Sequence, residues 1–176
     1  KICEEFEILE EDHLKLAPKS DMAAKKFERK STIRETDDKE DGGGGVMATL
    51  KGGRIFEKVG VNVSAVYGNL APEAQKSITA RKAIPELKDD PRFWASGISL
   101  VAHMRNPHTP AIHLNTRMFW TPHAWWFGGG TDLNPSIEND DDTNFFHQTL
   151  KKKCDKHNQS YYKKFKDWAD EYFFIP

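Results

Sequence analysis

Two segments close together in the chain predict the centre of a sheet: Gly97-Ile-Ser-Leu-Val-Ala-His-Met104 and Ala111-Ile-His-Leu-Asn-Thr-Arg-Met-Phe-Trp120. Both segments alternate, so that apolar side chains fall on one side and mostly polar or small ones on the other. This period of two is typical of a β-strand with one buried face. The residues between them, Arg105–Pro110, include an asparagine and two prolines and predict a turn. The two segments therefore predict a β-hairpin.

Further strands are predicted on both sides of this hairpin. Val46–Leu50 and Arg54–Tyr67 alternate around the pair Gly52-Gly53, and Trp125–Gly130 begins another strand. The run Gly42–Gly45 predicts a flexible turn, or a place where the backbone approaches a ligand closely. Apolar residues at helical spacing, with suitable capping residues, predict helices over four ranges: 1–16, 72–83, 139–157 and 161–172.

Composition narrows the function classes. The 176 residues carry a net charge of −1, so the chain lacks the basic surplus typical of nucleic-acid-binding proteins. No apolar run is long enough for a transmembrane helix, and the first residues are too acidic for a secretion signal. Cys3 and Cys154 are far apart and form no metal-binding or disulfide pattern. We therefore expect a globular protein of about one domain in the reducing cytoplasm.

A set of polar residues follows the alternation of the hairpin. If odd-numbered residues pair with odd-numbered ones, one sheet face carries Ser99, His103, His113, Asn115 and Arg117. Asp132 follows shortly afterwards, behind a glycine run. An arginine in such a set is suited to a bidentate pair with a carboxylate, and an aspartate accepts hydrogen bonds from N–H groups. The alternative is an ordinary solvated sheet face, which explains any one of these residues taken alone.

Aromatic residues flank the polar set: Phe119, Trp120, Trp125, Trp126 and Phe127. Together with Arg117 they suit a large flat ligand with acidic substituents. Aromatic residues in strands are also common in a hydrophobic core, and the residues alone do not name the ligand.

Several longer motifs resemble one family. The stretches Phe93–Arg117 and Trp125–Pro135 resemble the signature of the aerobic, oxygen-dependent coproporphyrinogen III oxidases. Four shorter matches occur in the same order: residues 27–30, 42–46, 56–64 and 165–174. The short connection between Arg117 and Trp125 resembles that of alphaproteobacterial members. The resemblance extends from about Phe27 to Pro176.

The resemblance implies a fold. Members have an α+β fold, in which a large, mostly antiparallel sheet is flanked by helices on both faces, and they form homodimers. It also implies that residues 1–176 are the N-terminal portion of a single coproporphyrinogen oxidase domain that is incomplete at its C-terminus. A sheet that stops midway would have an unpaired edge.

The resemblance also implies an activity and its residues. The family converts two propionates of coproporphyrinogen III to vinyl groups, giving protoporphyrinogen IX in haem biosynthesis, with molecular oxygen as co-substrate and no organic cofactor. His113 and Asp132 match catalytic positions. Ser99 and the segment Asn115, Thr116 and Arg117 match substrate-binding positions. His103 and His147 match positions of a candidate divalent metal site.

Three other functions compete with this one. A non-catalytic tetrapyrrole-binding protein would use the same aromatic surroundings without needing His113. An inactive fragment would not turn over the substrate, and a metal-dependent hydrolase would use His103, His113 and His147.

Overall fold

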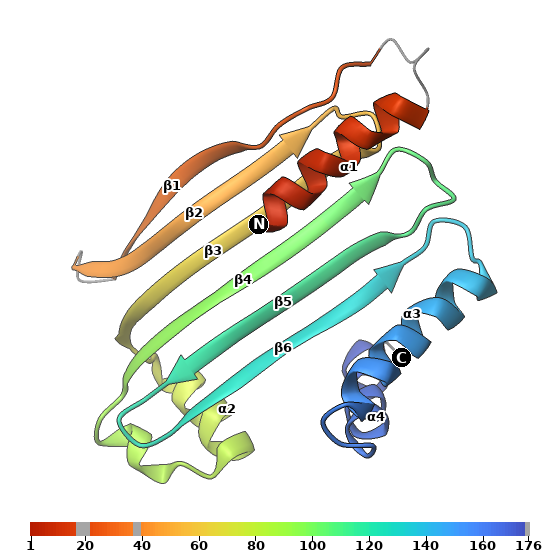
Figure 1. The fold of residues 1–176 in the computed structure, drawn as a ribbon. Coiled ribbons are helices and arrows are strands. Elements are labelled where there is room, and N and C mark those ends of the chain that lie inside the picture. The colour runs from red at the N-terminus through yellow and green to blue at the C-terminus, as the bar shows by residue number, and fades with distance from the viewer. Residues whose placement is uncertain (17–21, 37–39, 175–176) are drawn as a thin grey trace. The chain divides into compact units, whose positions relative to one another are not determined.

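The computed structural model describes residues 1–16, 22–36 and 40–174, and the chain divides into two compact units. The first unit, Lys1–Ser136, contains every strand of the described residues and two α-helices. The second, Ile137–Pro176, is helical (Figure 1). The single domain expected over residues 1–176 stays a prediction.

The first unit is built on one antiparallel sheet. Its strands are β1 (Glu28–Glu35), β2 (Asp41–Lys51), β3 (Phe56–Asn69), β4 (Arg92–Met104), β5 (Ala111–Trp120) and β6 (Trp125–Asn134). Each strand pairs with the next one along the chain, so the order in space equals the order in sequence (Figure 1). The predicted hairpin is β4–β5, and the large antiparallel sheet is confirmed.

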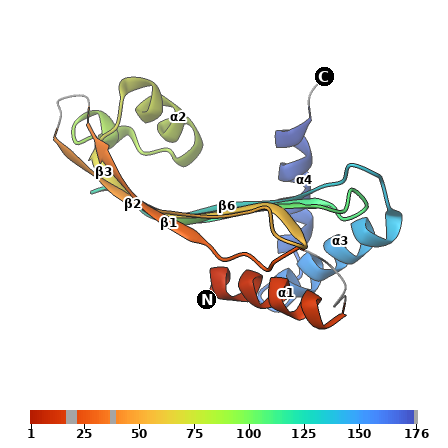
Figure 2. The same ribbon diagram turned by 90° about the horizontal axis from the view of Figure 1, so that it is seen from above.

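Two helices cover opposite faces of this sheet. Helix α1 (Ile2–Leu16) lies on one face, and helix α2 (Pro72–Lys82), followed by a short 3₁₀ turn (Pro85–Lys88), lies on the other (Figure 2). Phe6 of α1 packs edge-on against Phe56, with ring centroids 5.0 Å apart. The α+β class with helices on both faces of the sheet is therefore confirmed.

The hydrophobic core lies on the α1 side of the sheet. It consists of Phe27, Ala48, Leu50, Phe56, Val59, Val61, Leu100 and Ala102. These residues follow the alternation that the sequence displays, because every second side chain of a strand points to the same face. The core stops before Val63, which shares this face but is 47% exposed.

A buried carboxylate fastens α1 to the turn between β2 and β3. Glu10 is fully buried, and its Oε2 accepts a hydrogen bond of 2.7 Å from the backbone N–H of Arg54. Its Oε1 accepts two more, each 2.9 Å long, from the N–H groups of Ile55 and Phe56. Buried charges persist only where hydrogen bonds compensate for lost hydration, and here three N–H groups do so.

The glycine run was predicted as a turn but lies within strand β2. A Cβ atom added at Gly43, Gly44 or Gly45 would come within 2.2 Å of a carbonyl oxygen of β1 or β3. The close approach is thus to neighbouring strands. Strand β1, which pairs with this run, was not predicted at all. Residues 17–21 and 37–39 of the charge-rich region around β1 lie outside the described residues.

The second unit is a pair of helices, α3 (Asp140–Asp155) and α4 (Tyr161–Phe173). The side chain of Asn139 caps α3 by accepting hydrogen bonds from the N–H groups of Asp141 and Asp142. His147 of α3 and Tyr162 of α4 contact each other, with 3.1 Å between Nδ1 and the hydroxyl oxygen. Both helices were predicted. No helix in the described ranges is long and apolar enough to cross a bilayer.

Candidate active site

The register of β4 and β5 places the predicted polar residues on one sheet face. Ser99 lies opposite Asn115, Gly97 opposite Arg117, and Val101 opposite His113. Directly opposed residues of antiparallel strands point to the same face, so the pairing of odd with odd residues is confirmed. We call this side the polar face. It carries Ser99, His103, His113, Asn115, Arg117 and Asp132, and it is the side opposite α1 and the core.

His113 and Asp132 form a hydrogen-bonded pair on the polar face. They are direct cross-strand neighbours of β5 and β6, with 2.9 Å between His113 Nδ1 and Asp132 Oδ2. Both side chains are partly shielded, at 34% and 22% exposed. An ionised carboxylate only accepts hydrogen bonds, so the neutral tautomer that fits this contact donates from Nδ1 to Asp132 and leaves Nε2 as an acceptor.

Asn134 is a third member of this arrangement that the sequence reasoning missed. Its side-chain Nδ2 donates to Asp132 Oδ1, while Oδ2 faces His113. The two contacts hold the carboxylate from both ends and fix its orientation. The spacing in the sequence could have indicated it, because Asn134 is two residues after Asp132 and side chains two residues apart in a strand point to the same face.

Glycines leave the polar face open beside these side chains. Gly128 lies opposite Arg117, and Gly130 lies opposite Asn115. A Cβ atom added at Gly130 or at Gly60 of β3 would meet nothing within 4 Å. The polar face is therefore bare backbone at Gly60 and Gly130, which leaves room for a flat ligand above the sheet, whereas a Cβ atom at Gly128 would meet the Arg117 side chain at 3.9 Å.

The side chain of Arg117 is exposed on the polar face. Among the described residues it has no ion-pair partner. Its guanidinium is therefore available to a carboxylate from outside the described chain, in the bidentate geometry that arginine favours.

Thr116 is the one predicted substrate residue of the first unit that does not share the polar face. It pairs with Ile98 of β4 and Gly129 of β6, which places it on the same side of the sheet as the core. Its predicted substrate contact stays a prediction.

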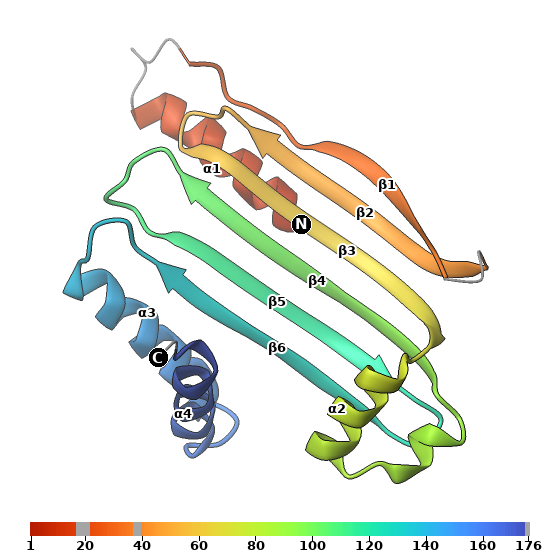
Figure 3. The ribbon, with the colours of Figure 1, turned by 180° about the vertical axis from the view of Figure 1, so that it is seen from behind.

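The aromatic residues divide between the two faces. Phe119 and Trp126 share the polar face, where Phe119 stacks between Phe93 and Trp126 at centroid distances of 5.5 and 4.9 Å. Helix α2 covers this end of the polar face, and Lys82 Nζ lies 5.3 Å from the Trp126 ring (Figure 3). The register puts Trp120, Trp125 and Phe127 on the opposite face, so they do not flank the polar set as predicted.

The predicted metal ligands do not form a recognisable donor set. No group of three or more His, Cys, Asp or Glu side chains is placed to hold a metal ion within the described part of the chain. His103 lies directly opposite Lys58, whose ammonium disfavours a second cation there. His147 belongs to the second unit and contacts Tyr162. The donors that surround His103 therefore do not fit a divalent metal.

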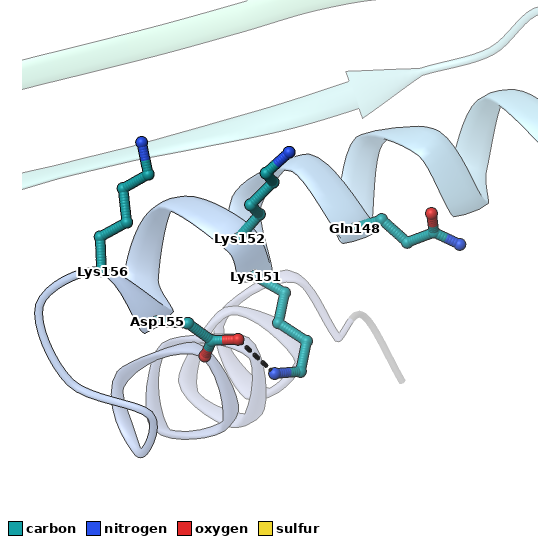
Figure 4. Close-up of a pocket in the computed structure, with 5 residues that line it drawn as sticks. All are labelled: Gln148, Lys151, Lys152, Asp155 and Lys156. Carbon is teal, nitrogen blue, oxygen red and sulfur yellow. Dashed lines mark hydrogen bonds and ion pairs between the residues drawn. The ribbon is translucent and has the colours of Figure 1, made fainter.

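A shallow hollow on α3 offers no alternative site. Its lining consists of Gln148, Lys151, Lys152, Asp155 and Lys156 (Figure 4). Lys151 and Asp155 form an ion pair of 2.6 Å one helical turn apart, as is usual on exposed helix surfaces. The other lysines extend away from this pair.

Comparison with known proteins identifies the family. The family model for coproporphyrinogen III oxidase matches residues 5–176. The chain is 45% identical over 174 residues to the oxygen-dependent coproporphyrinogen-III oxidase of Rickettsia peacockii, covering 99% of this chain and 57% of the relative. It is 49% identical over 144 residues to the enzyme of that name in Drosophila melanogaster, covering 78% of this chain and 37% of the relative.

The human relative, named as the mitochondrial oxygen-dependent enzyme, is 46% identical over 144 residues, covering 78% of this chain and 32% of that protein. The chain thus spans about a third to somewhat more than half of the relatives it matches. A family match over residues 5–176, together with 45% identity over 99% of the chain, leads to one conclusion: the chain belongs to the coproporphyrinogen III oxidase family.

Proposed function

We propose that the protein containing this chain is an oxygen-dependent coproporphyrinogen III oxidase. It would convert two propionates of coproporphyrinogen III to vinyl groups and so yield protoporphyrinogen IX. The observation that carries the proposal is the His113–Asp132 pair, which lies on the same open sheet face as the exposed guanidinium of Arg117, with the bare glycine Gly130 between them on β6. Relatives that carry this enzyme's name support it.

The reaction balances with oxygen as the only co-substrate. Each propionate loses its carboxyl carbon as carbon dioxide and one hydrogen from the carbon next to the pyrrole ring, and a carbon–carbon double bond forms. The two electrons released reduce one molecule of oxygen to hydrogen peroxide. The reduced tetrapyrrole is electron-rich, so we propose that no organic cofactor takes part.

The polar face would supply placement and proton transfer. Arg117 would anchor a propionate carboxylate, with Ser99 and Asn115 as neutral hydrogen-bonding groups beside it. Asp132 would accept a pyrrole N–H, because each carboxylate oxygen keeps a lone pair beyond its contact with His113 or Asn134. The free Nε2 of His113 would take up and release the proton that moves during the reaction.

Two finer properties remain proposals that rest on the family resemblance. We propose that the whole protein is a homodimer and works in the cytoplasm. A divalent cation at His103 and His147 is not part of the proposal, because the donors around His103 do not fit one, and no step of the reaction above depends on it.

The proposal is tested with the full-length protein and coproporphyrinogen III prepared under anaerobic conditions. On addition of oxygen we expect one oxygen consumed and one carbon dioxide released for each vinyl group formed, without added flavin, haem or nicotinamide. His113→Gln should abolish turnover. His108→Gln, an exposed histidine in the turn between β4 and β5, is the matched control and should not.

Each competing function predicts a different result. Tight binding of the substrate without oxygen consumption would establish a tetrapyrrole-binding protein and refute the proposal. Loss of all activity in the presence of chelators, together with hydrolytic products, would favour the metal-dependent hydrolase.

A further inference from the structure

A small basic hollow lies on the polar face, away from the His113–Asp132 pair. It is lined by Lys51, Glu57, Lys58 and His103. Lys51 of β2 lies directly opposite Lys58 of β3, which in turn lies directly opposite His103 of β4. Three nitrogen-bearing side chains from three neighbouring strands therefore form a row across the sheet.

The charges of this row favour an anion. The hollow is lined by two ammonium groups, those of Lys51 and Lys58, and by one carboxylate, that of Glu57. In the described part of the chain, neither lysine forms an ion pair. Like charges directly opposite each other in a sheet destabilise it, so the Lys51–Lys58 pairing has an electrostatic cost that a bound anion would relieve. A divalent metal beside the same lysines would increase that cost.

The hollow lies at one end of the polar face, and Arg117 lies nearer the middle of strands β4 and β5. Arg117 is level with Gly97 of β4, and the hollow is level with His103, six residues further along that strand. At about 3.3 Å per residue the two positions are roughly 20 Å apart along the sheet. His113, which lies opposite Val101 of β4, is between Arg117 and the hollow along the strand direction.

We propose that the basic hollow binds a second carboxylate of the substrate. This inference rests on the proposed function, because it assumes a large flat ligand with several carboxylates around its rim. Arg117 would hold one carboxylate, Lys58 with Lys51 would hold another, and the ring between them would lie over His113 and Asp132. A ring N–H group of His103 would donate a hydrogen bond to this second carboxylate.

The test is equilibrium binding of coproporphyrin III, the stable oxidised form with four propionates, to the full-length protein, followed by fluorescence. Lys58→Gln should raise its Kd about tenfold, the effect of losing one charge-assisted hydrogen bond. The Kd of mesoporphyrin, which has only two propionates, should change less than twofold. Lys58→Arg keeps the positive charge, so its Kd for coproporphyrin III should be close to that of the unaltered protein.

Glu57→Gln separates an anion site from a metal site. Removal of the only acid in the hollow should lower the Kd for coproporphyrin III about threefold if an anion binds there. If the hollow holds a metal instead, Glu57→Gln and His103→Gln should both weaken binding of Mn²⁺ or Zn²⁺ in a calorimetric titration, and the inference is overturned. Lys88→Gln, on the exposed 3₁₀ turn, is the control for general loss of positive charge.

Binding and turnover distinguish the two proposals. If the protein oxidises coproporphyrinogen III but neither Lys58→Gln nor Glu57→Gln changes the Kd, the second subsite is wrong and the proposed function stands. If the charge dependence of binding is as expected but no oxygen is consumed, the subsite stands and the proposed function is wrong.

Discussion

Replacing Glu10 by glutamine should weaken the attachment of α1 to the sheet. The side chain is fully buried and accepts three backbone hydrogen bonds, two at Oε1 and one at Oε2. Glutamine has the same size but only one acceptor oxygen. If that oxygen takes the place of Oε1, the amide nitrogen faces the N–H of Arg54 across 2.7 Å, and two donors oppose each other.

The expected cost follows from this count of hydrogen bonds. One charge-assisted hydrogen bond is lost, which costs about 1.5–3 kcal/mol, and the buried N–H of Arg54 loses its acceptor. The remaining two bonds lose their ionic partner and weaken. We therefore expect Glu10→Gln to lower the free energy of unfolding by about 2–4 kcal/mol.

Urea unfolding of the full-length protein, followed by circular dichroism, measures this change. Glu11→Gln alters the neighbouring residue, which is exposed, and should change the free energy of unfolding by less than about 0.5 kcal/mol. If both variants unfold at the same urea concentration as the unaltered protein, the carboxylate does not hold α1 in place.

Three further predictions concern the polar face and one surface pair. Arg117→Gln should raise KM with little change in kcat, because it removes about 1.5–3 kcal/mol of carboxylate binding; an unchanged KM in steady-state kinetics would contradict this. Asp132→Asn should lower kcat by roughly 30-fold or more, since the amide keeps the size but loses the charge facing His113; unchanged turnover would refute the role of the pair. Hydrogen bonds from Arg92 lower the pKa of Asp90 to about 2, so the stabilisation from this pair is present above the ordinary aspartate pKa and is lost as the pH falls toward 2. An NMR titration of Asp90 with a midpoint near 4 would show that the pair does not form in solution.

The central strands were predictable because burial imposes a pattern. Leu100 and Ala102 alternate with Ser99 and His103, and only one register buries the first pair while leaving the second on the open face of the sheet. Helix α3 was predictable for a local reason, namely the capping residue Asn139 followed by acids in the first turn. Both signals come from the residues of the element itself.

The edge of the sheet was not predictable in this way. Every residue of β1 is exposed, so no buried face forces an alternation on its sequence. The glycines of β2 have no side chains to alternate, and their close approach to β1 and β3 depends on strands that are distant in sequence. Edge and glycine positions therefore require tertiary information.

The candidate site was only partly predictable. Alternation gave the shared face of Ser99, His113 and Arg117, but it could not show that His113 and Asp132 touch, because this contact depends on the register of β5 and β6. The same register sends Trp125 and Phe127 to the opposite face. A shift of the β5–β6 register by one residue would have put Trp125 and Phe127 on the polar face and moved Asp132 to the opposite face.

The sequential order of the six strands has a consequence for how the protein folds. Each strand pairs with the one made just before it, so no strand pairing has to wait for a later part of the chain. Strands can then add one after another during synthesis on the ribosome. The slowest of these additions should be that of β4 to β3, because it closes the long connection 70–91, which contains α2. The bonds from Glu10 to the turn at Ile55 span 44 to 46 residues, so we expect docking of α1 to follow completion of the β2–β3 hairpin.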